Sequence, residues 1–222
     1  MGLLDWLFRR PRFTRFEDSF AMDRENLWPS LRDSIAKQRR DGFQIWIVTH
    51  FADTFSELQD LFDQWDVEYQ IGDQLMQPQF AVETSRKLGC GVLLTLAELL
   101  TPAESVDREI EGAISLSLIV VEKHPLVEND RRLESFARMI SCPVRFGYFM
   151  AIDDIVVRRA VNDTTIQILK QLGMKDHELI TSIMITRRLE TVLSRESAKF
   201  TTNHRADSAA QWYKLNLVRE DS

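Results

Sequence analysis

The chain has 222 residues, of which 44% are hydrophobic and 28% are charged, and its net charge at pH 7 is −6. This composition is typical of a soluble globular protein with one domain and extensions, or with two small domains. The acidic middle of the chain, where residues 16–156 hold 13 basic and 25 acidic groups, argues against a broad nucleic-acid surface. Because no apolar run reaches about 18 residues, we expect no transmembrane helix.

The first 15 residues form a basic arm, with four arginines and one aspartate. The arm lacks the basic, apolar and small-residue order of a secretory signal. Its apolar residues beside arginines predict contact with an anionic membrane surface, and docking on the domain itself is an equal alternative. The residues for membrane contact are Leu3, Leu4, Trp6, Leu7, Phe8, Arg9 and Arg10.

Helical and strand patterns alternate after this arm. Leu27, Leu31 and Ile35 are spaced for one helix face, and the run FQIWIVTHF at 43–51 predicts a buried strand. The pattern T-x-x-E at Thr54 and Glu57 predicts a capping box that opens the next helix. Four more strand patterns follow, VEYQI at 67–71, GVLLTL at 91–96, SLSLIVVE at 115–122 and VRFGYFMAI at 144–152. This alternation predicts a mostly parallel sheet covered by helices on both faces.

The remainder of the chain reads as helical. Helices are predicted within 163–174, where Gly173 lies near the C-cap, within 177–200 and within 206–218. We therefore expect three parts, an amphipathic arm at 1–15, an α/β domain at 16–160 and a helical extension at 161–222.

The stretch RRLESFARMISCP at 131–143 raises the main functional question. Leu133, Phe136, Ala137 and Ile140 follow helical spacing, so the stretch predicts a helix with one apolar face. Its arginines suggest a nucleotide site, whereas its apolar stripe suggests ordinary packing.

Four stretches in chain order carry a family resemblance. They resemble successive segments of the second RecA-like motor domain of SecA, the preprotein translocase ATPase of helicase superfamily 2, and the start of its helical scaffold. Within them, His124, Arg131, Arg132 and Arg138 fall on positions of matching family residues and form a remnant motif. The stretches are DRENLWPSLRDSIAKQRRDGFQIWIVTHFADTFSELQDLF at 23–62, SLIVVEKHPLVENDRRLESFARMI at 117–140, RFGYFMAIDDIVVRR at 145–159 and LKQLGMKDHELITSIMITRRLETVLSRESAKF at 169–200.

The nucleotide motifs of that family are substituted here. The family's arginine motif, Q-x-x-G-R-x-G-R, supplies fingers that neutralise charge in phosphoryl transfer. Phe136 stands at its glutamine, and Ile140 and Pro143 stand at its two finger arginines. The family's G-R-G-T-D turn reads ELLTP at 98–102, and no G-x-x-x-x-G-K-[ST] loop or other trace of the first motor domain occurs.

The resemblance implies an α/β, RecA-like fold of the superfamily 2 helicase C-terminal domain type, with a mostly parallel sheet and a C-terminal helical extension. It implies a non-catalytic SecA-like pseudo-motor domain that binds a protein partner, with a link to protein translocation and no cofactor. The alternatives are half of a split ATPase, completed in trans by a separate first motor domain, and an unrelated small-molecule α/β enzyme. We expect a cytoplasmic location, with peripheral contact at the inner face of the membrane left open.

Two groups of polar residues offer other chemistry. His50 and Asp53 follow a strand and, with Cys90 or Cys142, suggest a nucleophile system, although capping and solvated-loop roles are the favoured interpretation. Both cysteines flank strands and are expected to be buried free thiols. The pair at 153–154 suggests a metal site, but a helix N-cap is favoured, and no metal is expected.

The last aromatic residues are candidates for an interface. Phe200, Trp212 and Tyr213 come late in the chain beside basic residues, which predicts an exposed protein-binding surface. Packing of the same residues back onto the domain is the equal alternative, because most large apolar residues are buried.

Overall fold

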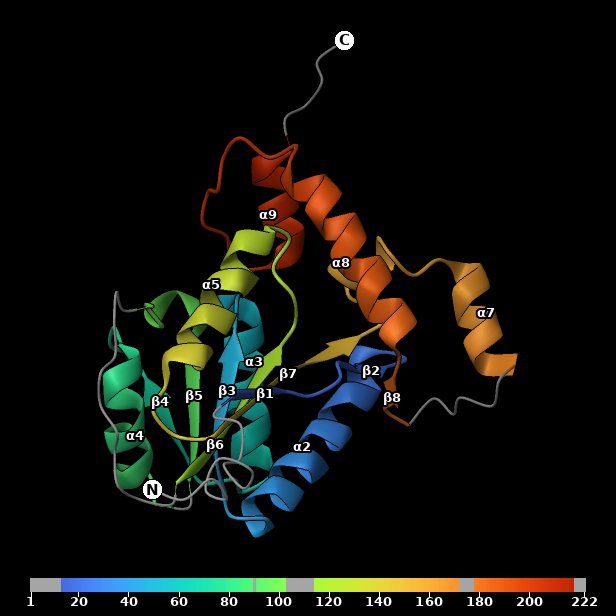
Figure 1. Ribbon diagram of the computed structural model, residues 1–222. Coiled ribbons are helices and arrows are strands. Elements are labelled where there is room, and N and C mark those ends of the chain that lie inside the picture. The colour runs from blue at the N-terminus through green and yellow to red at the C-terminus, as the bar shows by residue number, and fades with distance from the viewer. Residues whose placement is uncertain (1–12, 90, 103–113, 172–177, 218–222) are drawn as a thin grey trace, which may run out of the picture.

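The structure, a computed structural model, describes residues 13–89, 91–102, 114–171 and 178–217. Within these ranges eight strands form one sheet (Figure 1). The strands are β1 (Phe13–Arg15), β2 (Ser19–Ala21), β3 (Phe43–Thr49), β4 (Tyr69–Gly72), β5 (Val92–Leu96), β6 (Ser115–Val121), β7 (Val144–Ala151) and β8 (Ile180–Thr181). The helices are α2 (Arg24–Arg40), α3 (Ala52–Gln64), α4 (Pro78–Lys87), the 3₁₀ turn η1 (Ala97–Leu99), α5 (Val127–Met139), α6 (Ile155–Arg158), α7 (Asp163–Gln171), α8 (Ile183–Ser197) and α9 (Ala209–Asn216).

The sheet is mostly parallel. Its strand order is β4-β5-β3-β6-β7-β2-β8, and β1 pairs with β7 beside β2. The pairings among β1 to β7 are parallel, and β8 runs antiparallel to β2. The α/β fold predicted from the sequence is confirmed, and the architecture is consistent with a RecA-like fold.

Helices cover both faces of the sheet. Successive strand residues point to opposite faces, so Ile45 and Ile47 of β3 join the cluster under α2 and α3. Trp46 and Val48 of the same strand join the cluster under α4, α5, α8 and α9. Burial on both sides explains why this strand reads as a continuous apolar run.

The arginine-bearing stretch at 131–143 forms the larger part of α5 and the turn after it. Leu133, Phe136, Ala137 and Ile140 are buried at 2% exposure or less, and α5 lies across the sheet in Figure 1. The predicted apolar face is therefore confirmed, and this helix packs on the core.

Two short strands near residue 20 were not predicted. β1 pairs with residues 144–146 of β7, and β2 pairs with residues 149–151 of the same strand. Between them Phe16 lies against Gly147, where an added Cβ would come within 2.2 Å of the Phe16 ring. Residues 13–15 of the predicted arm therefore belong to the sheet, whereas its proposed membrane residues lie outside the described residues.

The predicted helical extension contains α7, α8 and α9, and also β8, which the sequence patterns did not indicate. Leu189 and Leu193 of α8 and Trp212 of α9 share one hydrophobic cluster with Phe136 of α5. The extension therefore packs on the α/β part, while Gly173 lies outside the described residues. The boundary near residue 160 stays a prediction. In the described ranges no helix has the length and apolarity needed to cross a membrane.

Candidate functional site

The polar residues with the most unusual environments gather where the central parallel strands end. His50 follows β3, Glu122, Lys123 and His124 follow β6, and Asp154 comes shortly after β7. Because parallel strands point the same way, these residues share one edge of the sheet. The carboxyl edge of such a sheet is where α/β proteins commonly bind ligands.

Asp130 in the first turn of α5 organises one half of this edge. Its Oδ1 lies 2.8 Å from His50 Nε2 and accepts from the His124 backbone N–H at 3.3 Å. Its Oδ2 lies 3.3 Å from Lys123 Nζ. All four residues have side chains that are buried or nearly so, so this is an interior ionic cluster rather than a surface pair.

The charges in this cluster are fixed by their neighbours. Burial raises the pKa of Asp130, but Lys123 and His50 outweigh it and lower the pKa to about 2. Asp130 is therefore an acceptor-only carboxylate, which places the proton of His50 on Nε2. The Lys123 ammonium also lies 3.5 Å from the centroid of the Tyr148 ring, a cation–π contact that offsets part of its burial cost.

His124 is a buried, neutral imidazole. Burial and the neighbouring His50 lower its pKa to about 3. Its Nδ1 accepts from the Leu126 backbone N–H at 2.9 Å, so the single ring proton lies on Nε2. The ring stacks on Phe51 and meets Trp212 edge-on. His124, from the predicted remnant motif, is therefore packed between aromatic side chains.

Glu122 supports the start of α3 from a neighbouring strand. Its Oε1 accepts from the backbone N–H groups of His50 and Phe51 at 3.0 and 3.1 Å. Its backbone has φ of 92°, a region that side-chain-bearing residues rarely adopt. Burial raises the pKa of Glu122 to about 8, although the hydrogen bond from Thr54 and the charge of Arg24 oppose the rise. A strained backbone holding a titratable group is a recurring feature of functional sites.

The predicted capping box at Thr54 and Glu57 is wrong. α3 begins at Ala52, and Thr54 is a buried residue of its first turn. Its Oγ1 donates to Glu122 Oε2 at 2.7 Å and accepts from Arg24 Nη2 at 2.7 Å. Glu57 accepts from Arg24 Nε at 2.9 Å and from the Trp28 indole at 2.8 Å. Both side chains thus hold α2 against α3 instead of capping a helix.

The acidic pair at 153–154 also differs from its predicted role. Asp154 occupies the N-cap position of α6, but its side chain does not cap that helix. The carboxylate instead accepts from the Ala151 backbone N–H at 3.1 Å and lies 3.4 Å from Arg24. Among the described residues no group of three or more potential ligands could hold a metal ion.

The structure contradicts the hypothesis that Cys142 is a nucleophile activated by His50 and Asp53. Its free thiol is buried, as predicted, and burial raises its pKa to about 11, so it is not a thiolate at neutral pH. Cys142 precedes β7, whereas His50 and Asp53 follow β3, so the parallel strands place them at opposite edges of the sheet. Cys90 lies outside the described residues.

The arginines of the remnant motif are dispersed on the surface. Arg131 pairs with Glu128, and Arg138 pairs with Glu134, each within α5. Arg132 donates to the backbone carbonyl of Glu98. These arginines do not join His124 in one cluster, because the helix directs them outward while His124 lies beneath its first turn.

The exposure predicted for the last aromatic residues is wrong for Trp212 and Tyr213. Trp212 and Tyr213 are buried at 1% and 3% exposure, and Phe200 is half-buried against both. The Trp212 indole donates to Asn203 Oδ1 at 2.9 Å. These aromatics pack α9 onto the domain, as the alternative interpretation held.

Sequence reasoning missed Asp130, Lys123 and Arg24 as members of the site. Asp130 sits in a helix, where an acidic residue of the first turn reads as an ordinary partner of the helix dipole. The sequence signal that could have indicated this site is the tripeptide Glu122 to His124, which directly follows an apolar strand.

Comparisons with known proteins show a distant similarity over part of the chain. A search of protein-family models finds no match. Over 114 residues, 51% of this chain, it is 30% identical to "Protein translocase subunit SecA" from Amoebophilus asiaticus (strain 5a2). The matched part spans 9% of that protein's length. The chain is therefore distantly similar to SecA over about half of its length.

Proposed function

We propose that the chain is a SecA-like pseudo-motor domain, which has the fold of the second motor domain, does not hydrolyse ATP and acts as a protein-interaction module. The distant similarity to SecA and the mostly parallel α/β sheet support the lineage. The link to protein translocation is part of the same proposal and rests on that similarity.

The observation that carries the proposal is the burial of two positions, one in α5 and one directly after it, that would face nucleotide in the family. Phe136 and Ile140 stand where the resemblance expects a glutamine and a finger arginine, and they are exposed by 0% and 2%. A finger must present its guanidinium group to phosphate oxygens. Side chains in the core cannot do so, which removes the family's means of stabilising the transition state.

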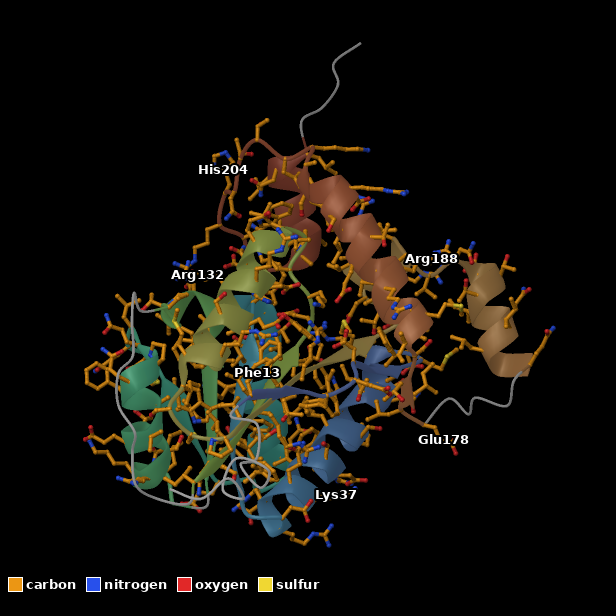
Figure 2. The ribbon with its side chains drawn as sticks, in the orientation of Figure 1. Phe13, Lys37, Arg132, Glu178, Arg188 and His204 are labelled. Atoms are coloured by element: carbon orange, nitrogen blue, oxygen red, sulfur yellow. The ribbon has the colours of Figure 1, made fainter. Side chains whose placement is uncertain are left out.

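Exposed apolar residues on the C-terminal helices support a role in protein binding. Ile183 and Met184 open α8 and are exposed by 55% and 67%. The exposed Arg187 and Arg188 follow on the same helix, and Figure 2 labels Arg188 there. An apolar spot beside basic residues is the composition of an interface with a charged rim.

The test combines ATP turnover with partner capture. Purified protein should release no phosphate from ATP above background, alone or with captured partners. Turnover that follows the protein through purification and is lost in a core-disrupting variant would refute the non-catalytic role. Turnover that needs both this chain and a co-purified ATPase would favour the split-ATPase alternative instead.

Partner capture from native lysate has a matched control. The double variant Ile183→Ser and Met184→Ser should lose a specific protein partner. The double variant Leu215→Ser and Leu217→Ser, which changes exposed apolar residues on and after α9, should retain it. Equal capture by the unmodified chain and both double variants would show that the exposed residues of α8 do not bind the partner.

Contact with a membrane belongs to the proposal on sequence grounds alone. If residues 1–12 bind an anionic surface, the chain sediments with anionic vesicles at low salt, and deletion of these residues abolishes sedimentation. Equal sedimentation of the truncated chain would rule out this contact.

A further inference from the structure

A small pocket opens at the carboxyl edge of the sheet, above the His124 ring. Its volume is about 230 Å³, and its walls come from the first turns of α5, from η1 and from the loop between α8 and α9, residues 198–208. Arg132 of α5 lines the pocket, and Figure 2 labels it together with His204 of that loop. Because residues from three distant segments meet here, the pocket could not be predicted from any one motif.

Two guanidinium groups contact the same residue, Glu98, at the pocket. Arg205 from the α8–α9 loop pairs with Glu98 Oε1 at 2.5 Å, and Arg132 from α5 donates to the Glu98 backbone carbonyl at 3.3 Å. Glu98 is the one acidic residue among the described residues that line the pocket. His124 is neutral, so these charged groups leave an excess of one positive charge.

Arg132 and Arg205 have N–H donors that their contacts with Glu98 do not use. Each guanidinium group carries five N–H donors. Among the described residues, Arg132 and Arg205 each engage one nitrogen with Glu98, and neither bonds to another side chain or carbonyl there. A planar fork of free N–H groups fits the paired oxygens of a carboxylate or phosphate.

Two side-chain amides add neutral donors. The Trp212 indole can only donate, so it fixes Asn203 Oδ1 as its acceptor and leaves the Asn203 NH₂ group available. His124 carries its proton on Nε2, 3.0 Å from the Asn129 amide. Because two donors cannot bond, the Asn129 amide must turn its oxygen to this proton and leave its NH₂ group available.

We propose that this pocket is a binding site for a small oxyanion, a carboxylate or phosphate group held between Arg132 and Arg205. The Asn129 and Asn203 amides donate to its remaining oxygens, and the Glu98 carboxylate competes for Arg205. The site lies at the start of α5, whereas Ile140 and Pro143, at the family's finger positions, lie beyond its end. The proposed interaction role rests on Ile183 and Met184 of α8, which do not line this pocket, so the two proposals stand separately.

Isothermal titration with inorganic phosphate and with succinate, each at constant ionic strength, tests the site and distinguishes its two ligand chemistries. We expect saturable binding of at least one of them. The double variant Arg132→Gln and Arg205→Gln should weaken binding by about tenfold or more, because it removes both charge-assisted contacts. Glu98→Gln should tighten binding, because it removes the internal competitor.

Arg138→Gln is the matched control, since Arg138 is an exposed arginine of the same helix that pairs with Glu134. It should bind like the unmodified chain. Absence of saturable binding by both the unmodified chain and Glu98→Gln at tens of millimolar would overturn the proposal. Undiminished binding by the double arginine variant would overturn it as well.

Discussion

The buried ionic cluster around Asp130 makes a quantitative prediction. Replacing Asp130 by asparagine keeps the shape of the side chain and removes its charge. The new NH₂ group then meets either the Lys123 ammonium or the His50 N–H, and in both cases two donors face each other. Lys123 also loses its counter-charge within the described part of the chain, apart from the face of the Tyr148 ring.

The expected loss can be estimated from the pKa of Asp130. Its folded-state value of about 2 lies nearly two units below the ordinary 3.8. One unit corresponds to about 1.4 kcal/mol, so the ionised form is stabilised by about 2 to 3 kcal/mol. Breaking a buried pair costs about 3 to 5 kcal/mol, because a charge is left behind. We therefore predict that Asp130→Asn lowers the free energy of unfolding by about 3 kcal/mol.

Urea unfolding at pH 7, followed by circular dichroism, measures this loss. Glu128→Gln is the control, because Glu128 also lies in the first turn of α5 but forms an exposed pair with Arg131. Exposed pairs contribute at most about 1 kcal/mol. A second change, Lys123→Met, should recover part of the loss in the Asp130→Asn background, since it removes the stranded ammonium.

The pH dependence gives a second measure of the same cluster. Because the folded pKa of Asp130 is depressed, its contribution is fully present above pH about 3.8 and is lost as pH falls toward 2. The Asp130→Asn variant should lack this acid-dependent step. If Asp130→Asn is no more destabilising than Glu128→Gln at pH 7, the cluster does not stabilise the fold as argued.

Three further changes test other parts of the structure. Because burial raises the pKa of Glu122, proton binding stabilises the folded state, and the free energy of unfolding should fall as pH rises from about 5 to 8. Glu122→Gln should remove this pH dependence, measured by urea unfolding at several pH values. An unchanged pH dependence in the variant would contradict the argument. Gly147→Ala should cost about 1 to 3 kcal/mol in urea unfolding, because its Cβ would overlap the Phe16 ring, and a smaller cost in a Phe16→Ala background would show that this overlap is the cause. Trp212→Ala should cost about 3 to 5 kcal/mol and lower the melting temperature, because the indole is buried; a small shift accompanied by loss of a partner would restore the interface hypothesis.

Local sequence patterns were enough to predict the layers of this protein. Residues 45–49 alternate between two buried faces, so an apolar strand covered on both sides could be predicted from composition and periodicity. The stripe through Leu133 and Phe136 predicted the face that α5 buries. Burial patterns of this kind are local, since strand and helix periods decide which side chains share a face.

Local patterns did not predict the short strands or the contacts at the start of α3. β1, β2 and β8 contain three, three and two residues, and each exists because a neighbouring strand offers hydrogen-bonding partners. The pattern at Thr54 matched a capping box, yet Glu122, directly after β6, accepts from the N–H groups before α3, and Thr54 bonds to Glu122 and Arg24.

The candidate sites depended on the tertiary structure most of all. The sequence drew attention to His50 and His124, but only the parallel order of β3 and β6 brings them together around Asp130. Arg132 and Arg205 are 73 positions apart, and their approach at Glu98 follows from the path of the loop between α8 and α9. Periodicity reports which way a side chain faces, whereas ionic contacts depend on where distant segments are placed, and that is set by packing of the whole chain.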